Sequence, residues 1–316
     1  MVNSSDKNQT DTLIKSPGSF YSSPSRVLLF LLAFLFATVS VRAQAKIHSL
    51  TNVIEGHAVG GVTTDLLGNI YVADFGEFVW KITPEGKREV FASGLYGASG
   101  NAIDNQGNLL QSNFYGDSIT KIDRKGQMQP FVTSGLSGPV GITINRKTGE
   151  VYVANCRSNS IAKIGTDGTV STFAKSDLFK CPNGVSFDGE GNLYVVNFRD
   201  NRMLKIDPGG VVTPFATVSD KGLGHLFFKK DRFYVTAFES HEIYEVTLDG
   251  TVKRILGTGK RGLVNGSSTK AQLSFPNGIA CDPYRPRIYI NEYVNDSAGS
   301  LPRRAIVREI DLKTDK

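Results

Sequence analysis

The chain has 316 residues, of which 40% are hydrophobic, and a formal net charge of +6 at pH 7. This content is sufficient for a folded core, and the length is compatible with one large closed β domain. Lys and Arg are spread along the chain rather than clustered, so we read the positive charge as a solubilising surface and do not expect a nucleic-acid partner.

The first 45 residues differ in composition from the rest. Residues 1–26 are polar, and residues 27–41 form an apolar run. Fifteen residues rise about 22 Å as a helix, short of the roughly 30 Å core of a bilayer. Arg26 precedes the run and Ala43-Gln44-Ala45 follows it, in the order typical of a secretory signal. We expect residues 1–45 to be a polar n-region and signal peptide, and the mature chain to be secreted or periplasmic. The alternative is an uncleaved N-terminal anchor, and we expect no other contact with a membrane.

From residue 57 onward the sequence repeats a unit of about 40 residues. The segment 181–216 contains four short apolar runs separated by turn signals such as Pro208-Gly209-Gly210. The start of the second run recurs at steps of 39, 42, 42, 40 and 55 residues, at Tyr71, Leu110, Tyr152, Tyr194, Tyr234 and Tyr289. This period predicts four-stranded propeller blades. The six copies are 57–92, 97–132, 138–174, 181–216, 222–256 and 275–311.

Two irregularities concern the sixth copy. A Gly-rich loop, residues 257–274, is inserted before it, and too few residues follow it for a fourth strand. Residues 46–55 precede the first copy and have no partner strands of their own. We therefore expect residues 46–55 to form the outer strand of the sixth blade, because closing the ring protects its edges. The predicted fold class is all-β: one monomeric six-bladed β-propeller, residues 46–316, closed by an N-terminal strand and preceded by the signal peptide.

Three motifs in the copies are specific. They are GPVGITI at 138–144, PNGVSFDGEGNLYVVN at 182–197, and the stretch from GTGKRGLVNG to AQLSFPNGIACD across 257–282. In these motifs the chain resembles the NHL-repeat β-propellers and the six-bladed SMP-30/gluconolactonase group over residues 57–311. The resemblance implies the fold and leaves the chemistry open, since such propellers host lactonases, lyases, other hydrolases and binding proteins.

Polar residues recur where each second strand should end, on the rim of the central channel. They are Asp74, Asn113, Asn155, Asn197 and Glu292, and Ala237 breaks the series. The loops leading into the first strands add Ser99, Asn183, His225 and Asn277. Oxygen ligands with one or two carboxylates suit a divalent cation such as Ca²⁺, which we assign to Asp74 and Glu292. A ligand would contact Asn113, Asn155, Asn183, Asn197 and Asn277. Alternatively, these side chains accept hydrogen bonds from their own turns and need no ligand.

The resemblance to gluconolactonases implies a metal held by a Glu, an Asn and an Asp, and only Asn183 matches. The position of the Glu falls at Gly60 and that of the Asp at Leu223. The lactonase site is therefore absent or rebuilt. His225 remains as a candidate catalytic base or ligand, against the alternative of a packed imidazole. Streptogramin lyases, which are also propellers, have a histidine and a metal near the channel mouth, so the resemblance to them implies a second enzymatic interpretation.

The three cysteines divide into a pair and a single thiol. Cys156 follows the second strand of the third copy, and Cys181 begins the fourth copy on the same rim. Export permits oxidation, so we predict a Cys156–Cys181 disulfide. Cys281 lies within a predicted first strand and should be a buried thiol.

Two classes of function follow from these observations. The first is an exported propeller that binds a small polar molecule or a protein at the channel mouth and is not catalytic, or only weakly so. The alternative is a metal-assisted hydrolase of the lactonase type, or a streptogramin-lyase-like enzyme.

Overall fold

The computed structural model describes residues 45–50, 54–56, 59–219, 221–294 and 303–312. The chain divides into two compact units, residues 1–41 and 42–316, and every described residue belongs to the second unit. Residues 1–44 of the expected signal peptide lie outside the described residues, and only its last residue, Ala45, is described. The described part is all-β, and it contains no helix that could cross a membrane.

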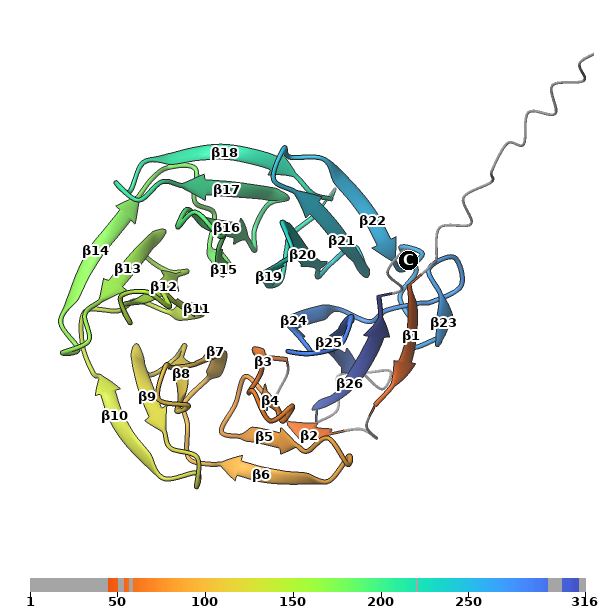
Figure 1. Cartoon of the computed structure of the whole chain (residues 1–316), viewed down its shortest axis with the longest axis horizontal. Helices are drawn as coiled ribbons and strands as arrows, with labels where there is room; N and C mark the ends of the chain where they lie inside the picture. Colours follow the sequence, from red (N-terminus) through yellow and green to blue (C-terminus); the bar gives the residue numbers. More distant parts are fainter. Residues whose placement is uncertain (1–44, 51–53, 57–58, 220, 295–302, 313–316) are drawn as a thin grey trace, which may run out of the picture. The chain divides into compact units, whose positions relative to one another are not determined.

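Five of the six blades are four-stranded antiparallel sheets with consecutive strands, and the first strand of each lies nearest the channel (Figure 1). Blade 1 contains β3 (Val62–Thr64), β4 (Ile70–Ala73), β5 (Val79–Ile82) and β6 (Arg88–Ala92). Blade 2 contains β7 (Ala98–Ile103), β8 (Leu109–Asn113), β9 (Ser118–Ile122) and β10 (Met128–Val132). Blade 3 contains β11 (Pro139–Ile144), β12 (Val151–Asn155), β13 (Ser160–Ile164) and β14 (Val170–Lys175). Blade 4 contains β15 (Pro182–Phe187), β16 (Leu193–Asn197), β17 (Arg202–Ile206) and β18 (Val212–Thr217). Blade 5 contains β19 (Leu226–Lys229), β20 (Arg232–Ala237), β21 (Glu242–Thr247) and β22 (Val252–Leu256).

Blade 6 combines strands from the N-terminal and C-terminal parts of the propeller sequence. Its path runs β24 (Pro276–Cys281), β25 (Arg287–Val294), β26 (Arg303–Asp311) and β1 (Lys46–Ser49). β23 (Gly266–Ser267), from the inserted loop, pairs with β1, and β2 (Ile54–Gly56) pairs with β26. The prediction of an all-β propeller with six blades is confirmed. The predicted outer strand 46–55 corresponds to two short strands, β1 and β2. That they hold the ring closed stays a prediction.

Aspartates fix the turns between the first and second strands. In blade 1, Asp65 Oδ1 accepts hydrogen bonds from the main-chain N–H groups of Leu67 and Asn69, each at 2.9 Å, and Asp104 and Asp188 do the same in blades 2 and 4. Gly68 completes this turn with φ +83°, where a side chain would be strained. The sequence thus sets the register of these three hairpins locally.

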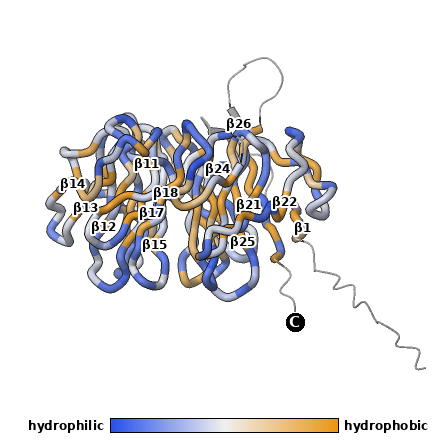
Figure 2. The backbone as a smooth tube through the Cα atoms, turned by 90° about the horizontal axis from the view of Figure 1, so that it is seen from above, coloured by the Kyte–Doolittle hydropathy of each residue, from blue (hydrophilic) through white to orange (hydrophobic). Residues whose placement is uncertain are grey.

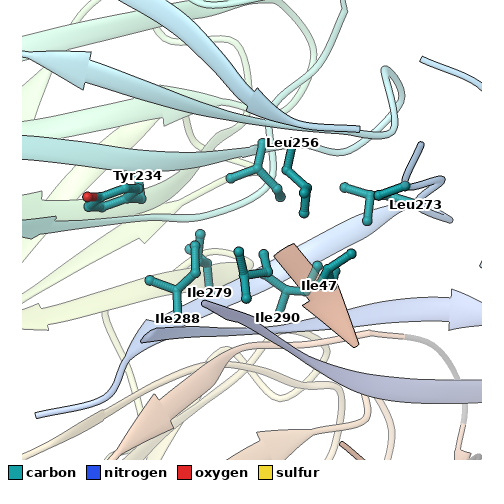
Figure 3. Packing of buried hydrophobic residues seen from close by; sticks show 10 residues of the cluster. Ile47, Tyr234, Leu256, Leu273, Ile279, Ile288 and Ile290 are labelled. Atoms are coloured by element: carbon teal, nitrogen blue, oxygen red, sulfur yellow. The ribbon is translucent and has the colours of Figure 1, made fainter. Parts of the chain in front are cut away.

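The core lies between neighbouring blades. Second strands such as β12 and β16 are buried along their whole length, which explains their continuous apolar sequence. Figure 3 shows one such layer, where Tyr234 and Leu256 of blade 5 face Ile279, Ile288 and Ile290 of blade 6. Ile47 of β1 packs in the same layer and is 2% exposed. Seen from the side, the strands are largely apolar, and the loops at both faces are largely hydrophilic (Figure 2).

Candidate functional site

A pocket of about 300 Å³ lies at one end of the central channel, where all six blades meet. We call it the mouth pocket. Its lining comes from the loops that lead into first strands and from those that leave second strands. The residues are Val59, Gly60, Phe75, Ser99, Phe114, Val140, Cys156, Cys181, Asn183, Phe198, Arg199, His225, Phe238 and Asn277.

The first strands pack backbone against backbone around the channel. A β-carbon at Gly100 would lie 2.2 Å from the carbonyl oxygen of Val140, and one at Gly141 would lie 2.0 Å from that of Asn183. Only glycine permits this approach. The repeated glycine of blades 1–4 and 6 therefore lets neighbouring first strands approach closely and brings the adjacent polar residues together.

The polar residues of the pocket clamp each blade to the next. Asn183 Nδ2 donates to the carbonyl of Gly224 at 2.8 Å, and Asn277 Nδ2 donates to that of Val59 at 2.7 Å. Ser99 Oγ donates to the carbonyl of Pro139 at 2.8 Å. The Oδ1 atoms of the two asparagines accept no hydrogen bond from the described residues, so they remain as acceptors for an N–H or O–H group.

His225 occupies a position that is glycine in the other five blades. In the other five blades the residue before the first regular pair of the inner strand is glycine, namely Gly61, Gly100, Gly141, Gly184 and Gly278. In blade 5 it is His225, which precedes the Leu226–Val235 pair. Its Nε2 is buried and has no hydrogen-bond partner among the described residues. Burial lowers the pKa of His225 to about 4, so the imidazole is neutral at pH 7.

The same register corrects the sequence alignment of blade 5. Its first hairpin is one residue shorter than that of blade 4, because Leu226 pairs with Val235 whereas Val185 pairs with Val195. The position of the Asp, expected from the sequence at Leu223, is therefore Gly224, which lies two residues before the first regular pair of blade 5 as Asn183 does in blade 4. Glycine cannot bind a cation through a side chain, so the missing ligand stays missing.

Aromatic residues that the sequence analysis missed line the pocket. Phe114, Phe198 and Phe238 each directly follow the last residue of a second strand, and Phe75 lies two residues after the end of β4. The ring centroids of Phe75 and Phe114 are 5.4 Å apart, and those of Phe198 and Phe238 are 5.3 Å apart. The sequence does carry a signal for them, because a phenylalanine directly follows Asp74, Asn113 and Asn197.

The polar residues at the strand ends lie outside the pocket lining. Asp74 Oδ1 accepts hydrogen bonds from the N–H groups of Gly76 and Phe78, at 2.7 and 3.0 Å. Asn155 Oδ1 accepts one from Ser137, and Asn197 Oδ1 accepts one from Lys180. Asn113 Nδ2 donates to Ser118 and Thr120. These contacts fit the alternative in which such side chains stabilise turns and loops.

Glu292 is an internal ion-pair partner. Its Oε2 lies 2.9 Å from Nη1 of Arg308, and both side chains are 0% exposed. Burial raises the pKa of Glu292 to about 7, and Arg308 acts in the opposite direction. Arg308 also donates to the carbonyls of Gln272 and Val264, and so anchors the inserted loop. Asp74 and Glu292 are therefore both engaged by protein groups.

A disulfide joins Cys156 and Cys181, with their Cα atoms 4.0 Å apart, and this is the pair expected from the sequence. Cys156 directly follows β12, the position that Phe114 and Phe198 hold in the neighbouring blades. The disulfide thus forms the wall of the mouth pocket in blade 3. Cys281 is a free thiol, as expected, but it is only partly buried. Full burial was expected, and the difference arises because Cys281 is the last residue of β24.

The charge of the pocket lining does not suit a hard cation. No Asp or Glu is among the lining residues that the structure describes, and Arg199 is exposed at the rim without an ion pair to another described residue. His48, Glu309 and Asp311 do gather on the outer strands of blade 6. Arg287 pairs with both of these acids at 2.9 Å, which accounts for that cluster.

Comparisons with known proteins show the fold alone. No family model matches the sequence, and no curated protein sequence matches it. A gluconolactonase from Xanthomonas campestris is 17% identical, with 83% of this chain and 89% of that chain covered and a TM-score of 0.64. A catalytically inactive histidine-to-alanine variant of virginiamycin B lyase from Staphylococcus aureus, solved with quinupristin, is 15% identical, with 85% and 100% covered and a TM-score of 0.62. An auxiliary nutrient binding protein from Bacteroides thetaiotaomicron is 13% identical, with 84% and 76% covered and a TM-score of 0.68. The resemblance to gluconolactonase-type propellers is confirmed at the level of the fold.

Proposed function

We propose that the protein is an exported six-bladed propeller that binds a small ring-containing molecule in the mouth pocket, with little or no catalytic activity. The observation that carries this proposal is the composition of the pocket lining. Four phenylalanine rings share the lining with neutral polar side chains and with Arg199, and no carboxylate is among the lining residues described. Such a pocket is suited to binding and offers no acid for hydrolysis.

The lining also narrows the chemistry of the ligand. The volume of about 300 Å³ is at the lower end of ligand pockets, which run from roughly 300 to 1,000 Å³. Stacked or edge-on rings add about 0.5–1.5 kcal/mol per aromatic pair. The amide oxygens of Asn183 and Asn277 select for a donor on the ligand. We therefore replace the small polar molecule expected from the sequence with a planar ring that carries an N–H or O–H group.

Fluorescence of a neutral aromatic probe tests this proposal. N-phenyl-1-naphthylamine carries two ring systems and one N–H donor, and it brightens on entering an apolar site. We expect saturable binding by the folded protein with one site attributable to the mouth pocket. Absence of a saturable component would overturn the proposal. N-terminal sequencing of the protein recovered from the medium or periplasm tests export, for which cleavage after Ala45 is expected.

The second candidate is a lyase or hydrolase in which His225 accepts a proton, and the unpartnered Nε2 favours it. The imidazole is neutral at pH 7 and has an acceptor nitrogen. However, Nε2 is covered, so a substrate reaches it only if the ring turns.

The resemblance to gluconolactonases implies calcium. Calcium does not fit the described lining, because the side-chain oxygens there belong to neutral Ser and Asn residues and none to a carboxylate. We derive no step through a metal. Elemental analysis of the purified protein decides between the candidates, since one tightly held calcium per chain would favour a metal-assisted enzyme.

A further inference from the structure

A second cleft, of about 560 Å³, lies on the face of the propeller opposite the mouth pocket. It is formed by the turns between first and second strands, mainly of blades 1 and 2, with Arg146 from blade 3 and Pro283 from blade 6. We call it the turn cleft. Its lining includes three cationic side chains, two acidic ones and several apolar ones.

The two acids of the turn cleft are committed to their own turns. Asp65 accepts hydrogen bonds from the N–H of Leu67, from the N–H and Nδ2 of Asn69, and from the hydroxyl of Tyr71. Asp104 accepts three equivalent bonds within its turn and lies 3.2 Å from Nζ of Lys121. The oxygens of both carboxylates are thus occupied by these contacts, although their negative charge remains. Burial lowers the pKa of Arg146, and the charge of Asp104 acts in the opposite direction.

A comparison of two blades explains why Lys81 forms no ion pair with Asp65, although it lies opposite Glu89 across the sheet, where its charge helps to lower the pKa of that carboxyl. Lys81 pairs across the sheet with Tyr71 in blade 1, and Lys121 pairs with Leu110 in blade 2. Leu110 has no hydroxyl, so Asp104 Oδ2 is left for Lys121. Tyr71 donates its hydroxyl to Asp65 Oδ2 at 3.1 Å, and Lys81 instead lies 5.9 Å above the ring of Phe91.

The two arginines of the turn cleft contact neutral groups. Arg124 Nη2 donates to the carbonyl of Gln106 at 3.0 Å, and Arg146 Nη1 donates to Oδ1 of Asn105 at 3.2 Å. Among the described residues, neither arginine has a carboxylate partner. These contacts orient the guanidinium groups without a direct ion pair, and three cations from three different segments converge on a cleft whose lining has two acids.

An apolar wall adjoins the cations. Leu66 and Leu67, at the tip of the first turn of blade 1, are 75% and 78% exposed. The hydroxyl of Tyr284 donates to the carbonyl of Leu66 at 2.7 Å and supports this tip from blade 6. The side chains of these two adjacent leucines are exposed beside the cations and are not part of the buried core.

We propose that the turn cleft binds an anionic amphiphile: a small molecule with a phosphate, sulfate or carboxylate head and a short apolar part. Lys81, Arg124 and Arg146 hold the head, since guanidinium groups suit the planar and tetrahedral oxyanions. Leu66 and Leu67 cover the apolar part. This site is independent of the mouth pocket and of the function proposed for it.

Calorimetric titration of the full chain with monomeric n-octyl phosphate tests the proposal. Inorganic phosphate should bind at least tenfold more weakly, and octyl glucoside, which has the same chain and no charge, should not bind at the cleft. Replacing Leu66→Ser and Leu67→Ser should weaken octyl phosphate and leave inorganic phosphate unchanged.

A matched pair of variants identifies the site. Arg124→Gln with Arg146→Gln should weaken octyl phosphate at least tenfold with an unchanged melting temperature. Lys125→Gln with Lys147→Gln removes the same charge from adjacent exposed positions outside the cleft and should change little. Equal weakening in both variants, or equal binding of octyl glucoside, overturns the proposal. So does binding to phosphatidylglycerol vesicles without binding to monomeric octyl phosphate, because the surface would then recognise a membrane.

Discussion

The main-chain N–H of His225 donates to the carbonyl oxygen of Asn277 at 3.0 Å, and this bond joins blade 5 to blade 6 at the wall of the mouth pocket. Thr236 Oγ1 reinforces the joint, because it accepts a bond from the same N–H at 2.8 Å and donates to the same carbonyl at 2.7 Å. The backbone of His225 is thus structural, while its imidazole is buried in neutral form. The residue therefore couples the stability of the ring to pH.

Acid should destabilise the wild-type protein through His225. Its pKa is about 4 in the folded state, below the ordinary value of 6.5, so the stabilising contribution is present above pH 6.5 and is lost as the pH falls towards 4. In urea titrations at pH 7 and pH 4, the unfolding free energy of wild type relative to His225→Gln should fall by roughly 2–3 kcal/mol. Parallel curves for the two proteins would show that the imidazole does not titrate in this range.

Glu292→Gln should destabilise the propeller rather than leave it intact. The exchange leaves Arg308 charged and fully buried without its partner, which costs about 3 kcal/mol. Glu239→Gln is the control, because Glu239 is exposed and should change stability by less than about 0.5 kcal/mol. Chemical denaturation measures both. Equal stability of the two variants would assign no structural role to the Glu292–Arg308 pair.

Removing the disulfide should weaken the pocket wall. Cys156→Ser opens a bridge that spans 25 residues and should cost about 2–4 kcal/mol in unfolding free energy. Reduction of the wild type should reproduce the effect, whereas the same reductant should not change the stability of Cys156→Ser. An unchanged melting temperature after verified reduction contradicts this prediction.

Strand β1 should stabilise the closed ring. Ile47 is buried in the layer between blades 5 and 6, so Ile47→Ala should cost about 2–4 kcal/mol. Lys46→Ala alters an exposed neighbour on the same strand and serves as the control. If denaturant unfolding of the two variants coincides, β1 does not hold blade 6 in solution.

The repeat made the fold predictable. The aromatic or leucine that starts each second strand, from Tyr71 to Tyr289, marks the six blades, and the position of Cys156 and Cys181 on one rim indicated their bond. Neither required contacts between distant parts of the chain to be known. The roles of Asp65 and Asp104 are likewise short-range, because each accepts hydrogen bonds from N–H groups two and four residues further along the chain.

The site was less predictable because it depends on distant contacts. Arg308 neutralises Glu292 across 16 residues of sequence, so the sequence pattern alone indicated a metal ligand. The one-residue difference in the hairpin of blade 5 decided the position equivalent to Asn183. Phe114 and Phe198 each follow an asparagine whose repetition is more conspicuous, although the phenylalanines line the pocket.

Titration of Phe198→Ala with N-phenyl-1-naphthylamine tests the central claim most directly. Phe198 lies in the pocket lining and contacts Phe238, so its removal should weaken the saturable binding of the probe at least tenfold. Tyr284→Ala removes an aromatic side chain that is 75% exposed on the opposite face and should leave binding unchanged. Equal affinity of wild type and Phe198→Ala, with both proteins folded, would contradict the claim that the mouth pocket is the ligand site.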